Sequence, residues 1–176
     1  LALGAFGEIR RQRPDARMIL VGDGPLRASL ERAHPQVVFA GLRIGDDLAA
    51  HYASADLFLF ASQTETFGNV TLEAMASGLC PVAYDYAAAA EVVRDLGNGG
   101  LARFGDAEGF IERALQLARD DDLRAQLGRA ARTTAEGIDW ERVNDAFAAA
   151  LLGVWRSAQP VQGSVGAPAL VRGAKA

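Results

Sequence analysis

The chain has 176 residues, of which 50% are hydrophobic and 23% are charged, and its formal net charge is −4. This composition is typical of a globular domain with a substantial core, and the negative charge gives no reason to expect nucleic-acid binding. No apolar run approaches the ~20 residues that a membrane-spanning helix requires. Cys80 is the only cysteine, which excludes an internal disulfide and fits a reducing compartment.

Helical and strand patterns alternate through the first half of the chain. Short apolar runs separated by amphipathic helices indicate βαβ units, and therefore an α/β fold with a Rossmann-like parallel sheet covered by helices on both faces. Pro25 falls in the first turn of one predicted helix, and Asp46 is predicted to cap another. The predicted elements are helix 6–13, strand 17–21, helix 25–33, strand 37–40, helix 46–53, strand 57–60, helix 69–77, strand 81–84 and helix 88–94.

From residue 106 onward the pattern is only helical, with predicted helices over 107–119, 123–136 and 140–155. The last residues are rich in glycine, alanine and proline and lack periodicity, which favours a disordered tail. We therefore assign 1–156 to one domain and 157–176 to a tail. Because a doubly wound domain opens with a strand and this chain opens in a helix, we expect the domain to lack its first strand and the chain to be part of a longer protein.

Two carboxylates eight residues apart mark the segment Glu-Thr-Phe-Gly-Asn-Val-Thr-Leu-Glu that begins at Glu65. Glu65 lies in the loop after strand 57–60, and Glu73 lies on the following helix. Both are therefore expected near the carboxyl edge of the parallel sheet, where open α/β folds bind ligands. Asn69 and Glu73 are four residues apart and share one helix face. The helix N-terminus would present free N–H groups and a positive dipole end to an anion.

This segment, with the Ala-Met-Ala-Ser-Gly and Pro-Val-Ala that follow it, resembles the donor-site signature of retaining GT-B glycosyltransferases. That family includes bacterial mannosyltransferases, glycogen synthase and sucrose synthase. Further similar landmarks lie in the same order at 21–25, 38–41, 52–56 and 140–141, so the resemblance covers roughly residues 1–156. It implies the donor-binding half of an enzyme that moves a hexose from a nucleoside-diphosphate sugar to an acceptor hydroxyl with retention and without a metal ion.

The resemblance also implies a role for each residue of the signature. Glu65 would accept hydrogen bonds from the donor-sugar hydroxyls and is the candidate catalytic residue, whereas Glu73 would accept from the ribose hydroxyls. Gly68 would let the ligand approach the backbone closely. A solvated loop acid and an ordinary helix acid are the alternative interpretations. The candidates for the donor sugar and diphosphate are Glu65, Thr66, Phe67, Gly68, Asn69 and Val70, and those for the nucleoside are Glu73, Leu42, Arg43 and Gly22.

Three other patterns are assigned structural roles. Residues 22–27 resemble a dinucleotide fingerprint, but Arg27 stands where glycine or alanine is needed, so we expect a turn and no NAD. The acids at 120–122 are placed to cap a helix. His34 and His51 lack partners at metal-ligand spacing, and His51 is expected to pack on its own helix. We therefore expect neither a cofactor nor a metal ion.

The expected ligand is a GDP- or UDP-hexose, with an acceptor glycan or lipid bound through a missing N-terminal domain. We expect no nucleic-acid partner, no transmembrane segment and a cytoplasmic location, with membrane contact only through the missing domain. Alanines at 87–90 replace a Gly-Gly turn of many relatives, which leaves the donor sugar and the role of Glu91 open. A sugar-nucleotide epimerase and a non-catalytic binding module are the rival functions. The isolated chain is expected to bind nucleotide weakly and to transfer no sugar.

Overall fold

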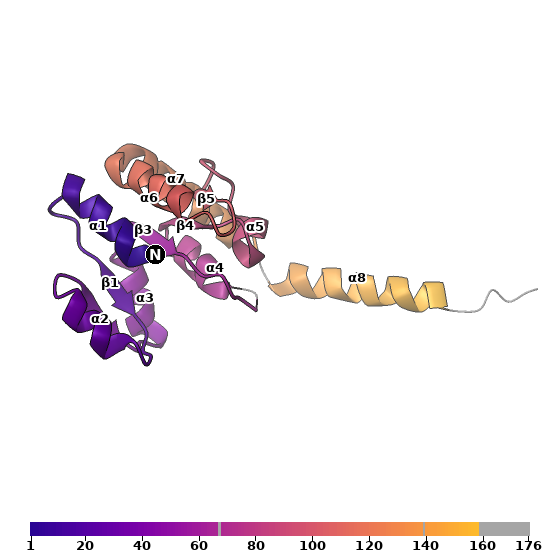
Figure 1. Cartoon of the computed structure of the whole chain (residues 1–176). Coiled ribbons are helices and arrows are strands. Elements are labelled where there is room, and N and C mark those ends of the chain that lie inside the picture. The colour runs from indigo at the N-terminus through magenta and orange to yellow at the C-terminus, as the bar shows by residue number, and fades with distance from the viewer. Residues whose placement is uncertain (67, 139, 159–176) are drawn as a thin grey trace, which may run out of the picture. The chain divides into compact units, whose positions relative to one another are not determined.

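A computed structural model describes residues 1–66, 68–138 and 140–158 (Figure 1). The chain divides into two compact units, Leu1–Ile138 and Asp139–Ala176. The first unit holds all five named strands, and in the second the described residues form one helix, α8 (Trp140–Ala158).

In the first unit, parallel strands alternate with helices. The strands are β1 (Ile19–Val21), β2 (Val38–Gly41), β3 (Leu57–Phe60), β4 (Cys80–Tyr84) and β5 (Gly100–Ala102). The helices are α1 (Ala2–Gln12), α2 (Arg27–Ala33), α3 (Gly45–Ala53), α4 (Asn69–Ala76), α5 (Ala87–Val92), α6 (Ala107–Arg119) and α7 (Asp121–Glu136). The predicted α/β architecture is confirmed, and strand 57–60 and helix 107–119 lie at the predicted residues.

The strands form two parallel sheets within the described residues, β1–β2 and β3–β4–β5, where the sequence predicts one. Leu20 pairs with Phe39 in the first sheet, and Phe58 pairs with Pro81 in the second. No ladder joins β1 to β3 in this part of the chain, so each of these two strands has one edge without a paired neighbour there. Ile19 and Val21 of β1 are 42% and 40% exposed.

The core is built on both faces of β4, and the alternation of side chains along this strand determines which residue faces which layer. Cys80, Val82 and Tyr84 belong to the cluster that includes residues of α1 and α6. Ala83 faces the opposite way and packs in the cluster with Met75 of α4 and residues of α5 and α7. Every residue of β4 is buried, so this strand positions the elements at its carboxyl end rigidly.

The acids at the start of α7 confirm one predicted cap, whereas the predicted cap of α3 is wrong. Asp120 accepts a hydrogen bond from the Leu123 amide at 2.9 Å, which satisfies a free donor at the helix start. In α3 the N-cap position is Ile44, and no side chain caps the helix. Asp46 lies inside the first turn, where it can stabilise the dipole but cannot occupy the cap position.

Two further differences concern short segments. Strand β5 has only three residues, Gly-Leu-Ala, and its sequence contains no β-branched residue to predict a strand. It forms because it pairs with Val82–Tyr84 of β4. Helix α2 begins at Arg27, so Pro25 lies in the turn before the helix and not in its first turn.

Helix α8, taken by itself, is amphipathic. Phe147, Leu151 and Val154 recur at helical spacing and form an apolar stripe. Among the described helices, none combines the length and the hydropathy needed to cross a bilayer.

We predict that the Cys80 thiol resists alkylation until the chain unfolds. Burial raises the pKa of this thiol from its ordinary value near 9 to about 12, and the Arg124 charge offsets only part of the effect. Since the reactive species is the thiolate, iodoacetamide should label the native chain far more slowly than the urea-denatured chain at pH 8. Because the folded pKa is the higher one, this thiol should also destabilise the fold as pH rises from about 9 to 12. Equal labelling rates in both states would contradict the prediction.

Candidate functional site

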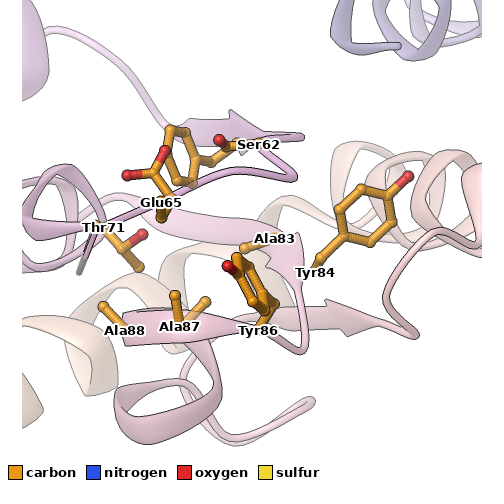
Figure 2. Close-up of a pocket in the computed structure, with 11 residues that line it drawn as sticks. Ser62, Glu65, Thr71, Ala83, Tyr84, Tyr86, Ala87 and Ala88 are labelled. Atoms are coloured by element: carbon orange, nitrogen blue, oxygen red, sulfur yellow. The ribbon is translucent and has the colours of Figure 1, made fainter.

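A pocket opens where β3 and β4 end, at the carboxyl edge of the three-stranded sheet (Figure 2). Parallel strands end at the same edge, so the loops that follow β3 and β4 meet there. The loop after β3 carries Glu65 and leads into α4, whereas the loop after β4 leads into α5. The pocket is lined by Phe60, Ser62, Glu65, Gly68, Thr71, Ala83, Tyr84, Tyr86, Ala87, Ala88 and Ala89.

Gly68 sets the geometry of the loop that precedes α4. Its backbone is left-handed, with φ 99° and ψ 44°, and it occupies the N-cap position of the helix. A Cβ at this position would lie 3.5 Å from the Ala88 Cβ and 3.7 Å from the Glu65 Cγ. These distances are ordinary contacts, so it is the left-handed conformation that favours glycine here.

Glu65 is half-buried and lies on the pocket wall between Ser62 and Thr71 (Figure 2). Among the described residues, no salt bridge pairs its carboxylate with a cation. An ionised carboxylate can only accept hydrogen bonds. Its position in the pocket therefore suits the recognition of ligand hydroxyl groups.

Thr71 contributes a buried hydroxyl that sequence reasoning did not select. The residue is 1% exposed, it lines the same pocket, and its Oγ1 finds no hydrogen-bond partner in the described part of the chain. Buried hydroxyls in folded proteins are nearly always paired, so this atom is available to a ligand or a water molecule. The only sequence signal was its place inside the motif, one turn beyond Gly68.

The amides expected to bind an anion lie at the start of α4. Asn69 is the first helical residue and is exposed, and Val70 follows it half-buried. The first N–H groups of an α-helix have no partner one turn earlier within the helix, so these amides can serve an anion. Thr66 is exposed just before them, while Phe67 lies outside the described residues.

Glu73 is one turn further along α4 and makes a contact that the sequence did not predict. Its Oε2 accepts a hydrogen bond from the hydroxyl of Tyr52, on α3, at 3.2 Å. Partial burial is the main reason that the pKa of Tyr52 rises to about 12, and the Glu73 charge and hydrogen bond add to the effect. Tyr52 consequently remains a protonated donor near neutral pH.

The remaining nucleoside candidates cluster where β1 and β2 end. Gly22 has φ 131°, and its amide donates to the Gly41 carbonyl at 2.8 Å, which ties the two loops together. Leu42 is 73% exposed beside this link. Arg43 forms an ion pair with Asp47 at 3.1 Å, and its buried Nε has no partner among the described residues. The structure brings these residues to one another, but no described hydrogen bond joins them to the Glu65 pocket.

The loop after β4 forms the other wall of the pocket. Tyr86 and Ala87 line it, and Ala87 has φ 49°, a left-handed conformation that is uncommon for a residue with a Cβ. In the sequence, the signal for this wall of the pocket was that alanines stand where many proteins of the resembled family carry glycines. Glu91 lies exposed on α5, away from the pocket lining, so it neither begins the helix nor faces the pocket.

The histidines and acids do not assemble a metal centre in the described part of the chain, where no group of three or more candidate ligands converges. His51 bonds through Nδ1 to the backbone oxygen of Asp47 at 2.7 Å, one turn earlier, so its predicted packing on its own helix is confirmed.

Comparison with known proteins gives consistent results. The family described as glycosyl transferases group 1 matches residues 1–120. A sulfoquinovosyl transferase of Arabidopsis thaliana is 35% identical over 153 residues, which cover 81% of this chain and 30% of that protein. A GDP-mannose-dependent alpha-mannosyltransferase of Mycobacterium tuberculosis is 37% identical over 129 residues, 73% of this chain and 34% of that protein. The chain thus spans about a third of the length of these relatives.

Solved structures agree in fold. The C-terminal domain of a glycosyl transferase group 1 protein from Francisella tularensis superposes with a TM-score of 0.67 at 23% identity, over 76% of this chain and 74% of that one. The Anabaena protein HepE, crystallised with UDP, superposes with a TM-score of 0.67 at 27% identity, over 80% of this chain and 42% of that one.

Proposed function

Because the chain belongs to the glycosyl transferases group 1 family, we propose that it is the donor-binding half of a retaining, metal-independent glycosyltransferase. The reaction would move a hexose from a nucleoside-diphosphate sugar to an acceptor hydroxyl. One observation carries the proposal: Glu65, the left-handed Gly68 and the start of α4 converge at the carboxyl edge of the sheet.

The diphosphate would bind at the start of α4. Negative charge grows on this leaving group as the bond to the sugar breaks, so fixed donors that face it lower the barrier. The amides of Phe67, Gly68, Asn69 and Val70 are the proposed donors, and the helix dipole adds to their effect. Gly68 would let the diphosphate approach the backbone closely, because glycine carries no Cβ.

Glu65 would bind the hydroxyls of the donor sugar. Its half-buried carboxylate, unpaired with any cation in the described residues, is suited to accept from them, and Thr66 would support it. We propose front-face attack, in which the departing phosphate helps to deprotonate the acceptor hydroxyl. No enzyme nucleophile is assigned, so Glu65 acts by holding the sugar in the reactive orientation.

The nucleoside would bind toward the ends of β1 and β2. Glu73 would accept from the ribose hydroxyls, and the loop that holds Gly22 and the loop that holds Leu42 and Arg43 would contact the base. Similar proteins include one crystallised with UDP and a GDP-mannose-dependent mannosyltransferase, which favours UDP and GDP as the first nucleotides to test.

The acceptor would be a glycan or lipid bound by a further domain, and the whole enzyme would work in the cytoplasm. Two observations support a contribution from beyond these residues: the chain covers about a third of its relatives, and among the described strands β1 and β3 each have one edge without a paired neighbour. We propose that one additional parallel strand joins these edges into a single sheet. An isolated chain would then bind donor weakly and lack the acceptor wall of the active site.

Calorimetric titration of UDP-, GDP- and ADP-hexoses tests the function. We expect one base to be preferred, with weak binding that persists in EDTA, and no transfer of sugar by the chain alone. The physical reason is that amide donors and Glu65 are present, whereas the acceptor contacts are proposed to lie elsewhere. Absence of binding to every nucleotide would contradict the donor site, and efficient transfer by the chain alone would contradict the need for a second domain.

A further inference from the structure

We propose that Tyr52 is a positioning residue that orients the Glu73 carboxylate toward the ribose of the nucleotide. The inference rests on the proposed function, because it assigns a partner to the residue that would bind the ribose. Tyr52 comes from α3 and Glu73 from α4, so their contact joins the helix that follows β2 to the helix that follows β3.

The position of the Tyr52 hydroxyl is set by ring packing. Its ring meets the Phe58 ring edge-on, with centroids 6.0 Å apart and an interplanar angle of 66°. Phe58 in turn stacks on Phe60 at 5.5 Å. Both phenylalanines belong to β3, the strand that leads into the loop with Glu65. The same strand therefore supports the donor to Glu73 and the loop that carries the other acid.

Glu73 needs such a partner because it lies on an exposed helix face. An exposed glutamate samples several rotamers, and a ligand that requires one of them must restrict the others on binding. The 3.2 Å hydrogen bond from Tyr52 to Oε2 favours one orientation before the ligand arrives. Preorganisation of this kind strengthens binding without adding a contact to the ligand.

The hydrogen bond leaves Glu73 able to do its proposed work. An ionised carboxylate offers about four acceptor positions on its two oxygens, and Tyr52 occupies one of them. Two vicinal ribose hydroxyls can therefore still donate to the same group. Tyr52 supplies the proton reliably, since burial and the neighbouring charge keep its phenol protonated well above neutral pH.

The test compares Tyr52→Phe, Glu73→Ala and the double variant in calorimetric titrations with UDP and GDP and with their 2′,3′-dideoxy counterparts. Phenylalanine keeps the ring packing on Phe58 and removes only the hydroxyl. We expect Tyr52→Phe to weaken binding of the ribonucleotide about three- to tenfold and to leave the 2′,3′-dideoxynucleotide, which lacks both hydroxyls, nearly unchanged. The double variant should bind as Glu73→Ala does, because the two residues act through one contact.

Several results would overturn the inference. If Tyr52→Phe weakens ribo- and dideoxynucleotide equally, Tyr52 has only a structural role, and tighter binding would mean that it competes with the ribose. A full loss in Glu73→Ala with no effect of Tyr52→Phe would refute the inference and leave the proposed function standing. Unchanged affinity in Glu73→Ala, or no nucleotide binding at all, would instead refute the proposed nucleoside site and this inference with it. Thermal melting of each variant confirms that it is folded.

Discussion

Gly128→Ala is expected to lower the free energy of unfolding by about 3 kcal/mol, a large part of the stability of a domain this size. Gly128 lies buried on α7, where a Cβ would overlap the carbonyl oxygen of Gly78 and approach the Cys80 amide nitrogen to 3.6 Å. The obstacle is the Gly78 carbonyl, in the turn between α4 and β4, and β4 pairs with strands on both sides. A backbone carbonyl cannot rotate away as a side chain could, so α7 must move away from this turn.

Gly7→Ala provides the matched control. Gly7 is also helical, in α1, but no atom lies within 4 Å of where its Cβ would stand. There the substitution should stabilise the chain by about 0.5–1 kcal/mol, because glycine costs that much in a helix interior. Urea denaturation followed by circular dichroism measures both. Equal stabilities for the two variants would show that α7 does not depend on this close approach to β4.

Gly68→Ala is expected to weaken binding of the nucleoside diphosphate about tenfold or more. A left-handed backbone costs a residue with a Cβ about 1–2 kcal/mol, and here the new methyl would also contact Ala88 and Glu65. The loop can relieve this strain only by a shift that moves Glu65 and the first amides of α4. Because those donors act through their positions, a small displacement reduces their interaction with the phosphates.

Gly105→Ala separates the conformational cost from the effect on the site. Gly105 has φ 80°, similar to the 99° of Gly68, but nothing lies within 4 Å of its missing Cβ and it does not line the pocket. Both variants should lose similar stability in thermal melting, and only Gly68→Ala should lose affinity in calorimetry. A similar loss of affinity in both would assign the effect to general destabilisation.

Particular elements show how far local pattern predicts this fold. The run Leu-Phe-Leu-Phe is predicted as a strand and forms β3, and the amphipathic repeat over 107–119 forms α6 at the same residues. In both, the pattern that predicts the element is the pattern that buries it. Strand β5 is missed because its three residues carry no preference of their own and pair only through contact with β4.

The candidate site also has features that local sequence predicts and features that only tertiary contacts create. The motif places Glu65, Gly68, Asn69 and Glu73 around a loop and a helix start, and the structure has that arrangement. The Tyr52–Glu73 hydrogen bond joins residues 21 positions apart, and no spacing rule predicts such a contact. That the Thr71 hydroxyl has no partner among the described residues is likewise a consequence of packing, since only the surrounding atoms determine it.

The sequence by itself determined the family, the alternation of strands and helices, and the two acids that flank a helix start, because local periodicity and a short motif specify them. Only the tertiary structure decided that the strands form two sheets, that α3 supplies a donor to Glu73, and that Ala87 and Thr71 line the pocket. These features depend on which surfaces meet across long stretches of chain. These long-range contacts follow from the packing of the whole unit and not from the secondary-structure preference of any one segment.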